Sequence, residues 1–193
     1  MNMYGITETT VHVTALPLDR AMAAEANASL IGAPLPSLQL HILDTRLHPV
    51  PTGTIGELYV SGGQLTRGYL HRPDLTAARF VADPHSSSGA RLYRTGDLAR
   101  RTRGGDVEYV GRSDFQVQMR GFRIELGEIE AALVRTAGVA RAVVVVHHDE
   151  RTATDRLVGY LVPETGVDLD VDTVLARVAS DLAAYMVPAT LVV

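Results

Sequence analysis

The sequence predicts a mixed α/β fold with a β-rich first part and a small α+β second part. Up to Ser113, short stretches that alternate apolar and polar residues are separated by Gly, Pro and Asp turns, which is typical of strands. Beyond Asp114, apolar residues also recur at helical spacing. We therefore expect two units, 1–113 and 114–193.

The first part is expected to contain mainly strands. A loop-like start leads into a short β-like stretch. Further strands surround a Pro-Thr-Gly turn, and two more flank Arg103-Gly104-Gly105 as a hairpin. A helix is expected near Pro73–Phe80, because Pro suits the first helical position and Asp74 falls in the first turn. The loop is at 2–8, and the strands are at 11–16, 38–44, 56–62, 98–102 and 106–110.

The second part is expected to mix strands and helices. Its first strand is half-buried, since apolar and polar residues alternate from Phe115 to Met119. A helix carries Leu126, Ile129 and Leu133 and stops at Gly138. The remaining expected elements are strands at 139–146 and 157–162, a helix from about Asp170 towards Pro188, and a strand at 188–193.

Composition excludes several classes of function. The 193 residues are 46% apolar and 21% charged, as in ordinary globular proteins that bury a core. The net charge of −4 argues against a nucleic-acid or membrane partner, and no stretch has membrane-spanning length. The absence of cysteine fits a cytoplasmic location and excludes thiolate metal sites. All 18 basic residues are arginines, so no step that needs a lysine ammonium can be completed by this chain.

Two segments carry residue types that suit a nucleotide. Tyr4, Gly5, Thr7 and Glu8 offer a ring for a base, backbone and hydroxyl groups for phosphate, and a carboxylate for Mg²⁺. Asp97 follows a glycine turn, where a loop carboxylate can accept both hydroxyls of a ribose.

Arg112 could donate to the same sugar. Taken singly, each segment also fits a plain turn, and Arg112 fits an exposed arginine.

Five ordered segments resemble the adenylation domains of nonribosomal peptide synthetases, within the acyl-adenylate-forming enzymes. The resemblance covers essentially the whole chain. It implies the β-rich end of a large adenylate-forming subdomain at 1–113, followed by a small, truncated C-terminal subdomain at 114–193. The segments are NMYGITE at 2–8, GELYVSGGQLTRGYL at 56–70, YRTGDL at 93–98, GRSDFQVQMRGFRIELGEIE at 111–130 and LAAYMVP at 182–188.

The resemblance also implies a two-step reaction that uses ATP and Mg²⁺. An amino acid is activated as an aminoacyl-adenylate, and the phosphopantetheine thiol of a peptidyl carrier domain then takes the aminoacyl group. By motif position, Tyr4 and Gly5 bind the nucleotide, with Tyr4 stacked on adenine. Thr7 touches phosphate, and Glu8 holds Mg²⁺.

Further roles follow from the same motif positions. Asp97 and Arg112 bind the ribose. Asp114 is the hinge of the small subdomain, and Gly121 lies in the loop that admits the pantetheine arm.

This sequence departs from the family pattern in several places. Ile6 replaces the commoner proline, and Gln118 stands where the long motif usually carries lysine. The phosphate loop of the family would precede Met1, and its C-terminal lysine would follow Val193. We therefore expect the isolated 193 residues to be catalytically inert.

The resemblance places three residues of the amino-acid pocket at Met3, Val11 and His12, a set similar to that of threonine-activating domains. A histidine can hydrogen-bond a side-chain hydroxyl, while Met and Val keep the pocket small and apolar. Alternatively, Val11 and His12 simply face neighbours in a sheet.

Two other functions remain open for the chain. One is an acyl- or aryl-CoA ligase of the same superfamily. The other is a non-catalytic module that docks a carrier domain or an MbtH-like helper protein. The remaining histidines lack the spacing of a metal site.

Overall fold

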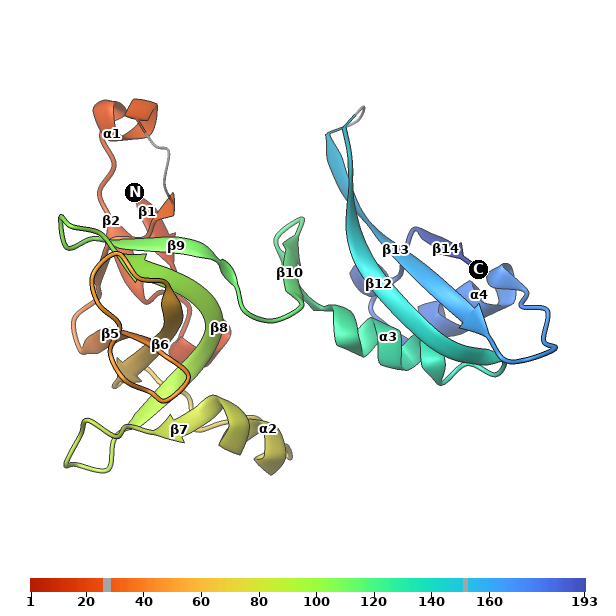
Figure 1. Ribbon diagram of the computed structural model, residues 1–193, viewed down its shortest axis with the longest axis horizontal. Coiled ribbons are helices and arrows are strands. Elements are labelled where there is room, and N and C mark those ends of the chain that lie inside the picture. The colour runs from red at the N-terminus through yellow and green to blue at the C-terminus, as the bar shows by residue number, and fades with distance from the viewer. Residues whose placement is uncertain (26–28, 151–152) are drawn as a thin grey trace. The chain divides into compact units, whose positions relative to one another are not determined.

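The computed structural model describes residues 1–25, 29–150 and 153–193, and its strands outnumber its helices (Figure 1). The expected mixed α/β class is confirmed. The chain forms two compact units, Met1–Asp114 and Phe115–Val193.

The first unit is built on an antiparallel sheet with the strand order β3-β9-β8-β6-β5, and β7 pairs with β8 outside this path. Its centre is apolar, with Leu58, Val60 and Leu92 fully buried. The strands are β3 (Ser29–Leu30), β5 (Leu38–Leu43), β6 (Gly56–Gly62), β7 (Phe80–Ala82), β8 (Arg91–Arg101) and β9 (Val107–Arg112).

A second, three-stranded sheet holds the N-terminal segment. β1 (Asn2–Tyr4) pairs with β2 (Thr14–Leu16), which pairs with β4 (Ala33–Pro34); the short α1 (Arg20–Glu25) follows β2. The expectation of a loop over 2–8 was therefore wrong for its first residues. The expected strand at 11–16 is shortened to β2, because Thr10 and Val11 turn the chain with φ of 60° and 72°.

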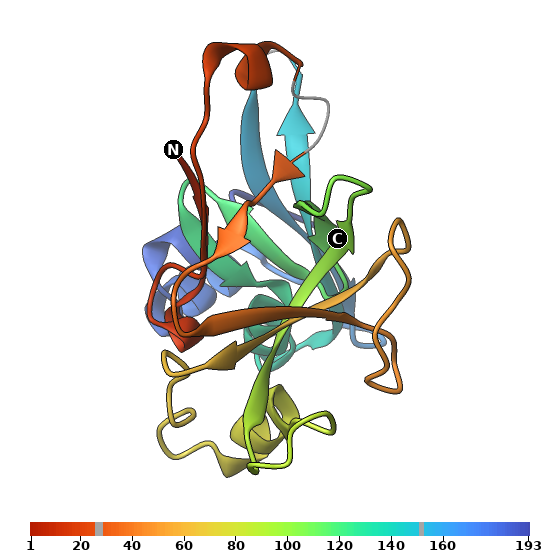
Figure 2. The same ribbon diagram turned by 90° about the vertical axis from the view of Figure 1, so that its left-hand side faces the viewer.

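The predicted helix near Pro73 is confirmed as α2 (Pro73–Arg79), with Pro at its start and Asp74 in its first turn. The residue after the helix is Phe80, whose buried ring packs on Tyr69 and Tyr93 at centroid distances of 5.9 and 5.0 Å. Figures 1 and 2 both show α2 at one end of the long strand β8. These aromatic contacts tie the end of the helix to the sheet.

The second unit begins with a hairpin of β10 (Gln116–Met119) and β11 (Phe122–Glu125). Its two-residue turn, Arg120-Gly121, has φ of 51° and 83°. Two consecutive positive φ values match the type I′ turns that fit the strand twist, and glycine adopts such a value without strain. Gly121 thus lies at the tip of a short hairpin.

The rest of this unit is a sheet with helices on one face. β12 (Val139–Asp149) and β13 (Thr154–Pro163) are antiparallel, and β14 (Thr190–Val192) runs parallel to β13. The buried face of this sheet forms one core with α3 (Leu126–Val134) and α4 (Val171–Asp181). The core residues include Ile129, Leu133, Val144, Leu157, Val174, Val178 and Leu191.

The last helix of this unit, α4, is shorter than expected. It starts as predicted after Asp170, whose carboxylate accepts from the backbone N–H of Asp172 at 3.2 Å. It ends at Asp181 rather than near Pro188, because Leu182 adopts an extended conformation; a 3₁₀ turn at Ala184–Met186 (η2) follows. Over the described ranges, no helix is both long and apolar enough to cross a membrane.

Candidate functional site

Asp97 and Arg112 face each other as directly opposed residues of β8 and β9. The expectation that Asp97 lies in a loop was wrong, since Asp97 belongs to β8, which runs from Arg91 to Arg101. Directly opposed residues of an antiparallel pair project to the same face of the sheet. Nη1 of Arg112 accordingly donates to Oδ1 of Asp97 at 2.6 Å.

The glycine turn expected in the YRTGDL segment is a β-bulge within strand β8. Across from β6, Tyr59 pairs with Arg94 while Glu57 pairs with Leu98, so β8 carries extra residues between these points. Thr95 fastens the bulge, because its hydroxyl donates to the Leu58 carbonyl at 2.6 Å and accepts from the Asp97 N–H at 2.9 Å.

Gly96 permits the bulge by its conformation and its size. Its φ is 77°, and a Cβ there would lie 2.5 Å from Oδ2 of Asp114 and 2.7 Å from Nη2 of Arg112. Real Cβ atoms essentially never show contacts this short, so the ends of both side chains would have to shift. The absent side chain therefore lets Arg112 and Asp114 pack against the strand.

Arg112 joins Asp97 to Asp114. Its Nε and Nη2 donate to the two carboxylate oxygens of Asp114 at 2.7 and 2.9 Å, and Nη2 also reaches the Thr95 carbonyl at 3.2 Å. Such a two-pronged arginine–carboxylate contact fixes orientation as well as charge. Arg79 donates to the same Asp114 oxygen, Oδ2, at 3.1 Å. Asp114 is thus held by two guanidinium groups.

Tyr4 completes this group, because its hydroxyl donates to Oδ2 of Asp97 from 93 positions away in the sequence. Burial and the nearby carboxylate of Asp97 raise the pKa of the Tyr4 phenol well above its usual value. The ring is partly buried, and Asp97 is only 3% exposed. We call Tyr4, Asp97, Arg112 and Asp114 the carboxylate–arginine cluster.

Glu8 lies in a separate hydrogen-bond network. It sits in the 3₁₀ turn Thr7–Thr9 (η1) and is 9% exposed. The hydroxyl of Tyr69 donates to Oε1 of Glu8 at 2.6 Å and lies 3.2 Å from the hydroxyl of Tyr93. Burial, followed by the hydrogen bond with Glu8, raises the pKa of Tyr69 above its usual value. A buried carboxylate needs such donors.

The other residues of the N-terminal segment form a tight, largely exposed turn. Gly5 lies so close to the backbone that a Cβ would come within 1.8 Å of the Val11 carbonyl oxygen. Thr7 and His12 are exposed, as are Met3 and Val11 at 39% and 61%. A positive φ on a β-branched residue such as Val11 is strained, and strain of this kind gathers at functional sites.

In the second unit, the residue after Gly121 is Phe122, whose ring stacks on that of Tyr185. The rings of Phe122 and Tyr185 stack at 4.1 Å with an interplanar angle of 6°. Phe122 directly follows the turn, and Tyr185 belongs to the 3₁₀ turn η2. The stack therefore ties the hairpin that carries Gly121 to the C-terminal segment of the same unit.

Three residues of these networks were not expected from the sequence to contribute to a site: Tyr69, Arg79 and Thr95. Tyr69 and Thr95 lie inside recognised motifs, so motif membership was the available signal. Arg79 ends an otherwise ordinary helix, and nothing in its sequence context indicated a role.

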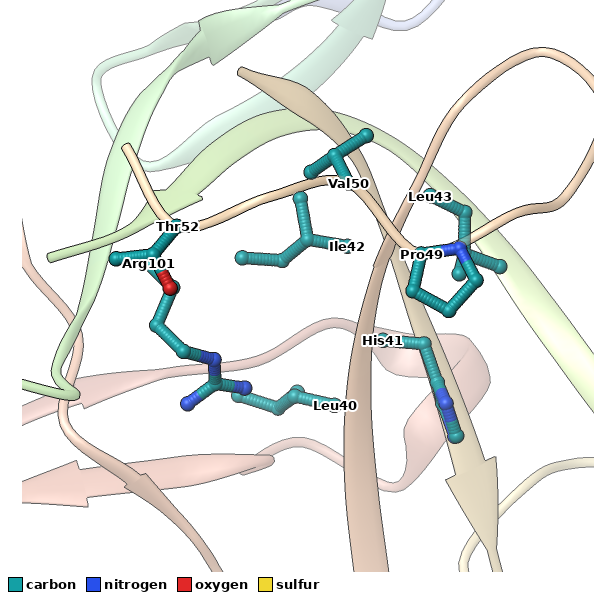
Figure 3. Close-up of a pocket in the computed structure, with 8 residues that line it drawn as sticks. All are labelled: Leu40, His41, Ile42, Leu43, Pro49, Val50, Thr52 and Arg101. Atoms are coloured by element: carbon teal, nitrogen blue, oxygen red, sulfur yellow. The ribbon is translucent and has the colours of Figure 1, made fainter. Parts of the chain in front are cut away.

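A cavity of about 170 Å³ lies elsewhere in the first unit (Figure 3). Figure 3 shows the apolar side chains of β5 and the nearby Arg101 around it. None of the motif residues discussed above lines this cavity. Its lining consists of Leu40 to Leu43, Pro49, Val50, Thr52 and Arg101. Within the part of the chain that the structure describes, no group of three or more His, Asp or Glu residues could hold a metal ion.

Known proteins resemble this chain along its whole length. The AMP-binding enzyme family matches residues 1–70, and the AMP-binding enzyme C-terminal domain matches residues 128–193. A dimodular nonribosomal peptide synthase of Bacillus subtilis (strain 168) is 53% identical over 100% of this chain, which spans 8% of the synthase.

Solved structures agree with the sequence comparisons. The crystal structure of IdnL1 has a TM-score of 0.87 and 30% identity, with 99% of this chain and 38% of IdnL1 covered. NpsA-ThdA, an artificially fused adenylation–PCP di-domain synthetase from Klebsiella oxytoca, has a TM-score of 0.76 and 29% identity, with 97% and 34% covered.

The chain therefore belongs to the AMP-binding enzymes. Within that family, it corresponds to part of an adenylation domain of the kind found in nonribosomal peptide synthetases, as the resemblance of its five motifs implied.

Proposed function

We propose that this chain supplies nucleotide-binding and hinge residues for activating an amino acid as its adenylate. The observation that carries the proposal is the carboxylate–arginine cluster. Tyr4 and Arg112, 93 and 15 positions from Asp97 in sequence, both donate to its carboxylate. Three separate motifs thus converge on one buried acid of an AMP-binding enzyme.

The cluster fits the ribose and base of a nucleotide, with one condition. A carboxylate has about four lone-pair sites, so Asp97 can accept ribose hydroxyls in place of the Tyr4 hydroxyl while it still binds Arg112. Because Asp97 is 3% exposed, we infer that Tyr4 must release its hydrogen bond when a nucleotide enters. The freed ring then stacks on adenine while Arg112 and Asp97 hold the ribose.

The Glu8 network fits a partial Mg²⁺ site. Mg²⁺ in nucleotide sites takes one or two protein carboxylates and completes its coordination with phosphate oxygens and water. Glu8 offers one carboxylate, oriented by Tyr69, and the preceding residue, Thr7, is exposed and has a hydroxyl for a phosphate contact. Mg·ATP, when bound, would supply the α-phosphate that the amino-acid carboxylate attacks, with pyrophosphate as the leaving group.

In the second step, Asp114 acts as the hinge and the Gly121 hairpin turn admits a phosphopantetheine arm. The open surroundings of Gly121, with nothing within 4 Å of an added Cβ, support this role. The adenylation–PCP fusion among the structural relatives supports a peptidyl carrier domain as partner. An MbtH-like helper protein is a further expected partner.

The proposed amino acid is threonine, with Met3, Val11 and His12 in its pocket. The exposure of all three supports access by a small ligand. The test is pyrophosphate exchange over the common amino acids in the native polypeptide that contains this chain. Threonine should give the highest rate, and a clear preference for a bulky aromatic or acidic substrate would exclude it.

Asp97→Asn tests the nucleotide role directly. We expect equilibrium binding of AMP to weaken about tenfold or more, since the ribose loses a charged acceptor. Asp74→Asn is the matched control, because Asp74 pairs with Arg72 on the surface of the same unit. Equal AMP affinity in Asp97→Asn and the parent protein would contradict the proposal.

One measurement tests the ligase alternative, and a second tests the expected inactivity of the isolated chain. Supplying coenzyme A instead of a carrier domain identifies a CoA ligase if it is the better acceptor. The isolated 193 residues should show no exchange, because the chain contains no lysine to balance charge at the reacting phosphate.

A further inference from the structure

We propose that Arg79 is a positioning residue that anchors the hinge residue Asp114 to the first unit. The chain leaves that unit after Asp114, and the next residue, Phe115, is 86% exposed. Fixing the Asp114 side chain therefore determines where the backbone becomes free to turn. The proposal rests on the hinge role of Asp114 given above.

The position of Arg79 is itself well determined. It is the last residue of α2, and the next residue, Phe80, is buried and pairs with Tyr93 of β8. The guanidinium reaches the bulge, where Nη1 would lie 3.1 Å from a Cβ on Gly96. From there Nη2 donates to Asp114 at 3.1 Å. Helix, aromatic packing and bulge together place this charge.

Burial makes the contact more than a surface ion pair. The side chains of Arg79 and Asp114 are 21% and 26% exposed, and that of Arg112 is 16% exposed. Ion pairs largely shielded from water are less screened than exposed pairs. Removing Arg79 leaves Asp114 with one of its two described guanidinium partners, Arg112, which also serves Asp97.

The two arginines hold Asp114 for different reasons. Arg112 also binds Asp97, so its contact with Asp114 depends on the state of the nucleotide site. Within the described part of the chain, Arg79 binds Asp114 but forms no hydrogen bond or ion pair with Tyr4 or Asp97. Arg79 therefore keeps Asp114 anchored when Arg112 engages a ribose.

Limited proteolysis with chymotrypsin tests the anchor, because the exposed Phe115 directly follows Asp114. In the native polypeptide that contains this chain, Arg79→Gln should speed cleavage after Phe115 about tenfold, as expected when local opening becomes easier. Cleavage after Tyr160, in a paired strand of the second unit, should keep its parent rate. Mass spectrometry of the fragments distinguishes the two cuts.

Arg100→Gln is the matched control. Arg100 lies on β8 and forms an ion pair with Glu108 at 2.8 Å, with 44% of its side chain exposed. This variant should leave both cleavage rates unchanged. Arg79→Lys, which retains the charge but not the planar fork, should give an intermediate rate at Phe115.

Two results would overturn the proposal: an unchanged rate at Phe115 in Arg79→Gln, or equal acceleration at Phe115 and Tyr160 in both Arg79 variants. The second result would mean that Arg79 supports the fold as a whole. The assay needs neither nucleotide nor turnover, so its failure is distinguishable from failure of the proposed function.

A functional readout complements proteolysis. AMP affinity in Arg79→Gln should stay within about twofold of the parent, since Arg79 does not bind Asp97. The ratio of carrier loading to pyrophosphate exchange should change, because the hinge serves the passage between the two steps. An unchanged ratio, despite faster cleavage, would contradict a role for the anchor in that passage.

Discussion

The hydroxyl of Tyr69 donates a 2.6 Å hydrogen bond to Oε1 of Glu8, a carboxylate that is 9% exposed. The two residues are 61 positions apart and come from different motifs. Tyr69 thereby orients the one acid of the N-terminal segment that is suited to Mg²⁺. This gives a structural segment, RGYL, a direct connection to the proposed chemistry.

Replacing Tyr69 with phenylalanine should destabilise the protein and weaken Mg²⁺ use. Loss of the donor to a buried carboxylate costs about 1–3 kcal/mol in unfolding free energy. Denaturant unfolding measures the first effect, and the Mg²⁺ dependence of pyrophosphate exchange measures the second. Tyr59→Phe is the control, because the Tyr59 hydroxyl makes only a 3.3 Å contact with Glu57. Identical behaviour of the two variants would argue against the role of Tyr69.

Gly96→Ala should lower stability more than the same change at Gly105. Both residues have positive φ, but only at Gly96 would the new Cβ meet other atoms, those of Asp114, Arg112 and Arg79. We expect about 1 kcal/mol at Gly105 from the backbone alone, and a larger loss at Gly96, where the ends of three charged side chains must also move. Thermal or denaturant unfolding gives both values. Equal losses would show that the cluster can shift to accommodate a methyl group.

Tyr4→Phe should leave nucleotide affinity intact or raise it. The ring remains available for stacking, and removal of the hydroxyl frees an oxygen of Asp97 for the ribose. Tyr4→Ala should weaken AMP binding about fivefold or more, since base–aromatic stacking contributes about 1–3 kcal/mol. Isothermal titration with AMP compares the variants. Equal weakening in both would show that the hydroxyl, and not the ring, matters for binding.

Stability should fall steeply in alkaline solution. The folded-state pKa values of Tyr4 and Tyr69 are raised, so their contributions are complete below the unfolded pKa of about 10 and are lost as pH rises above it. Tyr4→Phe and Tyr69→Phe should each flatten this loss above about pH 10. Unfolding free energies measured from pH 7 to 11 test the prediction, with Tyr160→Phe at an exposed position as control. Curves of unchanged slope in both test variants would refute it.

Phe122→Ala should slow carrier loading while leaving pyrophosphate exchange nearly unchanged. The variant loses the stack on Tyr185, worth about 0.5–1.5 kcal/mol beyond burial, and so loosens the hairpin that carries Gly121. Phe122→Tyr retains a ring and should restore loading. Rates of the two half-reactions, measured separately, provide the test. Loss of both rates together would indicate a general structural role.

Much of the fold follows from local patterns in the sequence. Pro73 and Asp74 mark the start of α2, and the spacing of Leu126, Ile129 and Leu133 matches the buried face of α3. Two segments expected to be loops are strands, because pairing with distant strands outweighs the local preference of their residues for turns. Asn2–Tyr4 forms a strand because it pairs with Thr14–Leu16, and Asp97 lies in a strand because β6 and β9 flank it on both sides.

The sequence by itself determined the family and the identities of the candidate nucleotide residues, because five ordered motifs carry that information in residue type and spacing. Tertiary structure alone decided how those residues are paired. Asp97 must be buried by its sheet before it needs Tyr4 and Arg112 as donors, and Arg79 reaches Asp114 only because Phe80 is packed against β8. A buried charge takes its partners from whatever the fold brings within reach, and spacing along the chain does not encode that distance.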